Sequence, residues 1–211
     1  MNKKREYRNM PFFAKKRDSE GGTEFLVEGY ASTFDEYIVC SFDGIDYKER
    51  IEPTAFDNCD MSDVVFRIDH EGPVYARTKA GTIKLNIDTK GLHQITDLSR
   101  TTNSRNIYED IDAGNYPQMS FAFTVKEDAY NSETHTRIIK QIEKLYDISP
   151  VSFPANPNTN LSARDYFNGV IKMEKAERLE AQRKEKETTE LRVWRDTLKK
   201  EIIKEMVRSE I

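Results

Sequence analysis

The chain has 211 residues, of which 37% are hydrophobic and 33% are charged, and its formal net charge is −4. This length allows one domain with an extension, or two small domains. The acidic balance disfavours a basic nucleic-acid-binding protein, and the longest apolar runs are far shorter than the ~20 residues that a transmembrane helix needs.

The N-terminal residues 1–22 are basic and end in two consecutive glycines. They predict a flexible basic arm that leads into the first strand. The arm has no apolar segment of the kind found in secretory signals, so we expect none. Basic arms can bind nucleic acid, but this one lacks the aromatic side chains on a sheet face that stack on bases.

Residues 23–169 carry the patterns of a β domain with short strands and turns. Polar and apolar side chains alternate strictly over residues 82–87, which is typical of a half-buried strand. Residues 88–91 then have the composition of a turn. Further strand patterns cover residues 25–31, 63–68, 92–98, 120–125 and 136–142.

The same domain contains two short helical patterns. Residues 104–113 place apolar side chains on one helix face, and Gly114 follows where a C-cap glycine belongs. Residues 54–59 fit a single helical turn, and residues 126–134 predict a polar loop. Together the patterns predict a mainly β fold with helices (α+β), arranged as a closed or partly closed antiparallel barrel.

Residues 170–211 predict a charged amphipathic C-terminal helix. All nine glycines and all seven prolines precede residue 170, and 22 of the last 40 residues are charged. The polar residues 181–190 predict an exposed connector. After it, an apolar stripe at steps of three or four residues consists of Leu191, Trp194, Leu198, Ile202 and Met206. Such a stripe must be buried, either on the β domain or on another chain.

The two cysteines, Cys40 and Cys59, have no paired spacing. They predict neither a disulfide scaffold nor a zinc site built on cysteine. A reducing cytosolic compartment fits this cysteine usage better than an oxidising one.

Three polar residues could together carry acyl-transfer chemistry. His70 ends an apolar strand just before a Gly-Pro turn, where a scaffold presents side chains to a cleft. Ser120 begins a strand on the face opposite its aromatic neighbours, and Asp147 lies in mid-strand among apolar residues, where it needs a polar partner. Taken singly, each fits a structural role, such as a hydrogen bond from the serine to backbone. Taken together, they would supply a nucleophile, a base and an acid that orients the base.

The order of His70, Ser120 and Asp147, with six sequence blocks, resembles the prohead maturation proteases of tailed phages from about Phe25 to Leu161. The blocks are GYASTF at 29–34, RIEPTAF at 50–56, VFRIDH at 65–70, GL at 91–92, MSFAF at 119–123 and DISPVSFPANP at 147–157. Thr54 and Ala122 stand where this family usually has glycine, and Asp147 stands where it usually has glutamate.

The resemblance implies a fold related to the herpesvirus assembly proteases and a serine endopeptidase with His70 as general base and Ser120 as nucleophile. Asp147 matches the acid position of the family, but its shorter side chain leaves the third role open. His93 is the rival third member, because the herpesvirus relatives are thought to use a second histidine. Its position before the serine argues against it. The remaining histidine, His135, lies in a polar loop.

The resemblance also implies a substrate and a place of action. The enzyme would cleave the scaffold-like part of the phage major capsid protein, and itself, inside the assembling prohead in the bacterial host cytoplasm. Its partners would be that capsid protein and further copies of this chain in a homo-oligomer, and no cofactor, metal or membrane is expected. The alternative is a non-catalytic capsid-assembly scaffold or chaperone that acts through the C-terminal helix. The presence of histidine, serine and acid in the family's order favours the enzyme.

Overall fold

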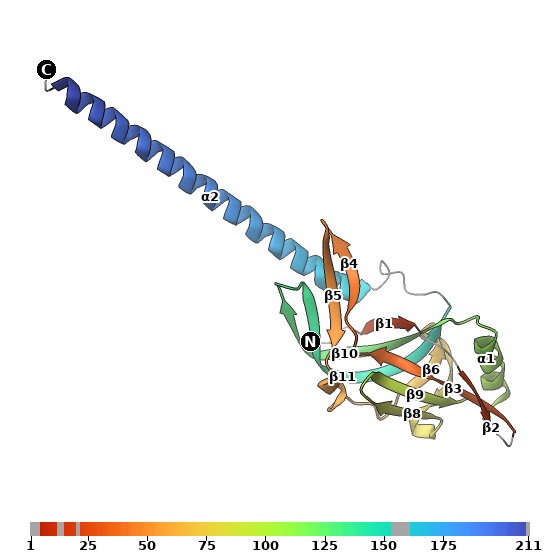
Figure 1. The fold of residues 1–211 in the computed structure, drawn as a ribbon. Helices are drawn as coiled ribbons and strands as arrows, with labels where there is room; N and C mark the ends of the chain where they lie inside the picture. Colours follow the sequence, from red (N-terminus) through yellow and green to blue (C-terminus); the bar gives the residue numbers. More distant parts are fainter. Residues whose placement is uncertain (1–4, 12–14, 20–21, 153–160, 210–211) are drawn as a thin grey trace. The chain divides into compact units, whose positions relative to one another are not determined.

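Two sheets and two α-helices make up the described part of the chain (Figure 1). The computed structural model describes residues 5–11, 15–19, 22–152 and 161–209. The chain divides into two compact units, Met1–Asp165 and Tyr166–Ile211. All the described strands belong to the first unit, and the second unit consists of the later part of the C-terminal helix.

The larger sheet is built around one long hairpin. It consists of β1 (Glu6–Pro11), β4 (Tyr37–Phe42), β5 (Ile45–Ile51), β6 (Val65–Ile68), β7 (Glu71–Arg77), β10 (Gln118–Asn131) and β11 (Thr136–Val151). β10 and β11 form the hairpin, and β1 pairs with the other side of β10. β11 pairs in parallel with β5 near its start and with β6 near its end, so β6 lies beside the last part of the hairpin.

The smaller sheet has four strands in the order β2-β3-β9-β8. These are β2 (Lys15–Ser19), β3 (Gly22–Thr33), β8 (Ile83–Ile87) and β9 (Gly91–Asp97). β9 begins at a glycine because its backbone passes very close to β3. A Cβ atom on Gly91 would lie 2.0 Å from the Ser32 carbonyl oxygen.

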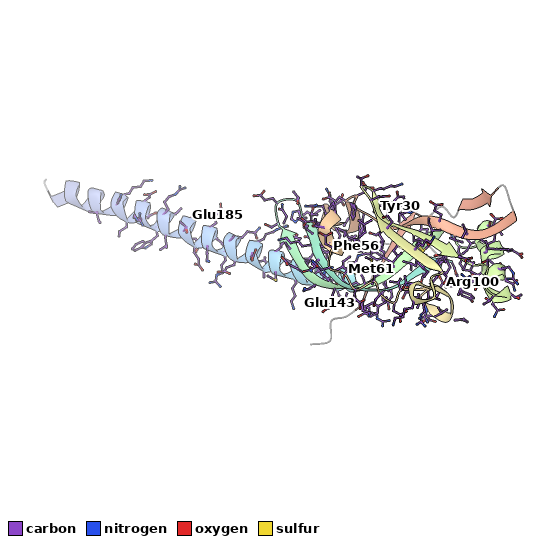
Figure 2. All side chains as sticks on the ribbon, turned by 90° about the horizontal axis from the view of Figure 1, so that it is seen from below. Tyr30, Phe56, Met61, Arg100, Glu143 and Glu185 are labelled. Atoms are coloured by element: carbon purple, nitrogen blue, oxygen red, sulfur yellow. The ribbon has the colours of Figure 1, made fainter. Side chains whose placement is uncertain are left out.

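Both sheets contribute to one hydrophobic core, which also includes side chains of α1 (Thr102–Asp112) and of a 3₁₀ turn at Pro53–Phe56. On β10, the Phe121 and Phe123 rings are fully buried and stack with centroids 4.7 Å apart. Side chains alternate between the faces of a strand, so Ser120 and Ala122 project from the other face of β10. The core thereby fixes the face that carries the serine. Phe56, which is also fully buried, is labelled in Figure 2 among the side chains of this unit.

Most of the expected local elements are confirmed. The alternating segment 82–87 contains β8, the pattern at 104–113 coincides with α1, and Gly114 follows the helix with φ 83°. The Thr101 side chain accepts a hydrogen bond from the Ser104 amide and caps the N-terminus of α1. The expected polar loop at 126–134 is wrong in extent, because β10 continues to Asn131 with its polar residues paired to β11.

The α+β class is confirmed, but the closed barrel is not. Hydrogen bonds among the described strands produce two separate sheets that do not close on themselves. The larger sheet also branches, because β11 pairs in parallel with β5 over one part of its length and with β6 over another.

The flexible arm expected over residues 1–22 also needs correction. In the described part of that range, β1 pairs with β10 and β2 pairs with β3. The sequence did not predict the pairing of β1 and β2, because the basic composition of the segment is typical of a solvated tail. One of its arginines, Arg8, is in fact fully buried against acidic partners.

The C-terminal helix α2 runs over Leu161–Ser209 without interruption. It continues through the polar residues 181–190, where i,i+4 ion pairs such as Lys184–Glu180, at 2.7 Å, stabilise an exposed helix. Side chains project outward around Glu185 (Figure 2). The stripe residues Leu191, Trp194, Leu198 and Ile202 are exposed, and the Met206 side chain lies outside the described residues. Among the described residues, none of the helices is long and apolar enough to cross a membrane.

Candidate active site

Ser120 and Asp147 come together through the register of the central hairpin. Ser120 on β10 lies opposite Ser149 on β11, and Ala122 lies opposite Asp147. Residues two apart on a strand share a face, and directly opposite residues are close neighbours. The hairpin therefore gathers the serine and the carboxylate on one face, where the Ser120, Ala122 and Ser149 side chains are fully buried.

His70 reaches the same face from the turn after β6. β6 runs parallel to β11 with Val65 next to Asp147, so the turn that follows lies close to the carboxylate. Asp69 and His70 both have positive φ, 50° and 61°. Non-glycine residues adopt this conformation rarely, and they do so mainly where the surrounding structure holds them.

Several hydrogen bonds hold the turn that carries His70. The Asp69 amide donates to the Pro150 carbonyl at 3.0 Å, and the Asp69 carboxylate accepts from the Ser152 amide at 2.9 Å. The Arg67 guanidinium donates to the His70 carbonyl at 3.1 Å. The histidine backbone is thus tied to the end of β11, the strand that carries Asp147.

The three side chains form a continuous hydrogen-bonded series. His70 Nδ1 lies 2.6 Å from Asp147 Oδ1, and His70 Nε2 lies 2.7 Å from Ser120 Oγ. An ionised carboxylate only accepts, so Nδ1 carries the proton on that side and Nε2 is left to accept from the serine hydroxyl. The Asp147 side chain is 4% exposed and that of His70 is 18% exposed, so the acid is buried and the imidazole is partly accessible to solvent.

The shorter acid at position 147 reaches the histidine without difficulty. The sequence left open whether Asp147 is the third member, because aspartate is one carbon shorter than the glutamate of the resembling family. The parallel pairing of β6 with β11 brings the His70 turn close enough for a 2.6 Å contact. Ala122, which replaces a usual glycine, is fully buried, whereas Thr54 is exposed at the start of a 3₁₀ turn.

His93 and His135 have other partners. His93 lies on β9 in the smaller sheet, where its Nε2 is 3.1 Å from Glu28 Oε1 and its ring packs against Tyr30. The Tyr130 hydroxyl lies 3.1 Å from His135 Nδ1 near the tip of the β10–β11 hairpin. The position beside His70 Nδ1 is taken by Asp147.

Two residues near this site were not identified from the sequence. The Ser149 hydroxyl donates to Asp147 Oδ1 at 2.8 Å, so this carboxylate oxygen accepts from both the serine and the histidine. The spacing of two residues along one strand was an available signal for Ser149. The Tyr7 ring on β1 packs edge-on against the His70 ring, with centroids 4.6 Å apart. No local signal pointed to Tyr7, because it approaches the site through long-range pairing.

The arrangement has the parts that acyl transfer needs: a hydroxyl, a base within proton-transfer distance, and a buried acid behind the base. Among the described residues, no group of three or more histidine, cysteine, aspartate or glutamate side chains is placed to hold a metal ion.

Comparison with known proteins identifies the family. Neither the search of curated proteins nor the search of solved structures gave a match. The family model for caudovirus prohead serine proteases matches residues 13–172. This range is most of the chain, and it contains His70, Ser120 and Asp147. This chain therefore belongs to the caudovirus prohead serine protease family.

Proposed function

We propose that this protein is a serine endopeptidase that cleaves the scaffold-like part of the phage major capsid protein, and itself, during prohead maturation. Membership of the family supports a role in capsid maturation. The observation that carries the catalytic assignment is the series from Asp147 through His70 to Ser120, with contacts of 2.6 and 2.7 Å. These residue types in this order are what activates a serine hydroxyl.

Ser120 is the nucleophile in this proposal. Its Oγ attacks the carbonyl carbon of the scissile peptide while its proton passes to His70 Nε2. The tetrahedral intermediate then collapses: the C–N bond breaks, and the leaving amine takes the proton from His70. An acyl-enzyme ester on Ser120 remains.

Water completes the reaction by the same route in reverse. A water molecule gives a proton to His70 Nε2 as its oxygen attacks the ester carbonyl. The C–O bond to Ser120 breaks, the serine oxygen recovers the proton from His70, and the product leaves as a carboxylic acid that loses its proton to solvent. Each transfer uses Nε2, the nitrogen that faces Ser120.

Asp147 is the orienting acid. Its carboxylate accepts from Nδ1, which keeps the other nitrogen free to act as the base, and its negative charge stabilises the imidazolium that forms during each step. The hydrogen bond from Ser149 fixes the carboxylate itself. Burial of this pair strengthens the interaction, because the local dielectric is lower than that of water.

The test is cleavage of the capsid protein. Co-expression with the major capsid protein from the same phage should yield shortened capsid protein, with fragment masses that define a cleavage site, and shortened copies of this chain. The matched control is Ser120→Ala, which removes one oxygen from a buried site and should leave both proteins at full length. Intact capsid protein that co-assembles equally well with either form would instead favour the non-catalytic scaffold.

A further inference from the structure

β1 places a tyrosine beside the catalytic strand. β1 pairs antiparallel with β10 (Figure 1). In this pairing, Tyr7 lies opposite Ala122 and Asn9 lies opposite Ser120. The Tyr7 side chain therefore projects on the same face as Ala122 and Ser120. It is 37% exposed, so part of the ring borders solvent at the site. β1 precedes residue 13, where the family match begins.

The Tyr7 ring packs against the His70 ring and adds a restraint to the hydrogen bonds of the imidazole. The centroids lie 4.6 Å apart at an interplanar angle of 64°, an edge-on arrangement that aromatic rings favour. Hydrogen bonds at Nδ1 and Nε2 hold the two ring nitrogens in place. The torsion between Cβ and the ring has only a weak preference of its own, so the hydrogen bonds and packing contacts determine the orientation of the imidazole. A packed ring on one side limits that rotation.

Burial of the next residue anchors β1 in place. Arg8 is fully buried, and its Nη2 donates to Glu49 Oε2 at 2.7 Å and to Glu6 Oε2 at 2.6 Å. Arg137 on β11 donates to the same two carboxylates, at 3.1 Å to Glu49 Oε2 and 2.8 Å to Glu6 Oε2. We call Glu6, Arg8, Glu49 and Arg137 the charge cluster.

The charge cluster makes release of β1 costly. Glu49 is fully buried, and removal of Arg8 would take away one of its two arginine partners. An incompletely compensated buried charge is strongly destabilising. Arg8 also donates to the Tyr7 carbonyl at 2.9 Å, so the cluster fixes the backbone that presents the ring to His70.

We propose that Tyr7 is a positioning residue for His70, and that β1 is thereby part of the catalytic unit. This inference rests on the proposed function of the same site. The ring keeps the imidazole turned so that Nε2 faces Ser120 Oγ. Its effect should appear in the rate of serine activation, because small misplacements of a base cost up to about 10²-fold in rate.

The test measures serine activation with a fluorophosphonate probe, which needs no peptide substrate. The Ser120 oxygen bonds to phosphorus, fluoride leaves, and the serine proton passes to His70. Tyr7→Ala should slow this labelling about tenfold or more. Tyr7→Phe keeps the ring and should remain within about twofold of the wild-type rate, which separates the ring contact from any role of the hydroxyl.

Tyr30→Ala is the matched control for loss of a tyrosine ring. Tyr30, which is labelled in Figure 2, lies in the smaller sheet. Its ring packs edge-on against that of His93, with centroids 5.1 Å apart. Its removal should lower the midpoint of thermal unfolding about as much as Tyr7→Ala does, but should leave the labelling rate unchanged. Tyr7→Leu, which preserves apolar cover on β1, should fold and label at an intermediate rate.

The outcomes separate the two proposals. If the wild-type protein is not labelled, the proposed catalytic function fails. If the wild type is labelled and folded Tyr7→Ala or Tyr7→Leu matches its rate, only the role of Tyr7 is overturned. A Tyr7→Phe rate as low as that of Tyr7→Ala would also overturn it, since the ring would then not be the active feature.

Discussion

Each residue of the hydrogen-bonded series depends on the other two. The serine hydroxyl has its base at 2.7 Å, and that base has its acid at 2.6 Å. The series should therefore act as a single unit rather than as three additive contributions.

The first prediction concerns this non-additivity. Ser120→Ala and His70→Ala should each abolish cleavage of the capsid protein, and the double variant should be no slower than the slower single variant. Circular dichroism should show that all three remain folded. Cleavage by Ser120→Ala at near the wild-type rate would end the serine-protease account.

The second prediction decides the third catalytic role. Asp147→Asn should slow cleavage by a large factor without removing it, because an amide favours the wrong imidazole tautomer, and the same change in an established triad costs about 10⁴ in rate. His93→Ala is the comparison, since His93 lies on the smaller sheet beside Glu28. If Asp147→Asn is silent and His93→Ala is inactive, the role belongs to His93.

The sequence predicted the residues of the series better than their surroundings. His70, Ser120 and Asp147 stand out because polar residues interrupt apolar strands, and because their order matches a known family. Ser149 was open to prediction from its spacing to Asp147. Tyr7 was not, since its contact with His70 depends on the pairing of β1 with β10, more than a hundred residues away along the chain.

At the scale of elements, local patterns predicted local structure. The alternation at 82–87 and the helical spacing at 104–113 are satisfied within β8 and α1 themselves. Residues 126–131 of β10 were missed because their polar composition is typical of a loop, whereas the strand expected at 136–142 is confirmed within β11. There the backbone pairing with β11 continues, and Arg137 on β11 binds Glu49 on the adjacent β5 and Glu6 on β1, which lies beyond β10.

The third prediction concerns the exposed stripe of α2. Its four described apolar residues are 40–63% exposed in the single chain. Burial of such side chains contributes about 1.5–3 kcal/mol each before the entropic cost of association. We therefore expect self-association through α2, with Trp194 emission shifting to shorter wavelength as protein concentration rises. Trp194 is the only tryptophan, so the signal is unambiguous.

A shortened chain that ends at Gly169 provides the control. It retains all the described strands and the buried residues Ala163 and Phe167 at the start of α2. It should stay folded, sediment as a smaller species than the full chain, and still cleave an accessible peptide. Precipitation or unfolding of the shortened chain would mean that the stripe belongs to the core of the β domain.

At the scale of the whole molecule, the charge cluster links stability to pH. Burial raises the pKa of the Glu6 carboxyl, but the hydrogen bond from Arg137 and the charge of Arg8 outweigh it and hold the pKa below its ordinary value of 4.5. A carboxyl whose pKa is lowered by folding stabilises the folded state above its unfolded pKa. That contribution is lost as the pH falls through the folded value.

The fourth prediction follows from the lowered pKa of Glu6. Below pH 4.5, the free energy of unfolding of the wild-type protein should fall more steeply with pH than that of Glu6→Gln, which cannot titrate. Denaturant unfolding at a series of pH values measures both slopes. Equal slopes for the two proteins would show that Glu6 does not contribute to acid sensitivity.

The overall architecture was predictable only as a class. Strand and helix patterns indicated a mainly β domain followed by a helix, and the structure has both. Whether the strands close into a barrel depends on which strands pair across the molecule. The parallel pairing of β11 with both β5 and β6 is an example, and a single sequence carries no local signal for such pairing.

The central claim is that Ser120 is a nucleophile activated by His70, and the most direct measurement is the site at which a fluorophosphonate attaches. Peptide mass spectrometry of the labelled wild-type protein should find one adduct, on Ser120. The adduct should be absent from Ser120→Ala and should form far more slowly in His70→Ala. An unlabelled Ser120 in protein that still shortens the capsid protein, or labelling of Ser120 at the same rate without His70, would contradict the account.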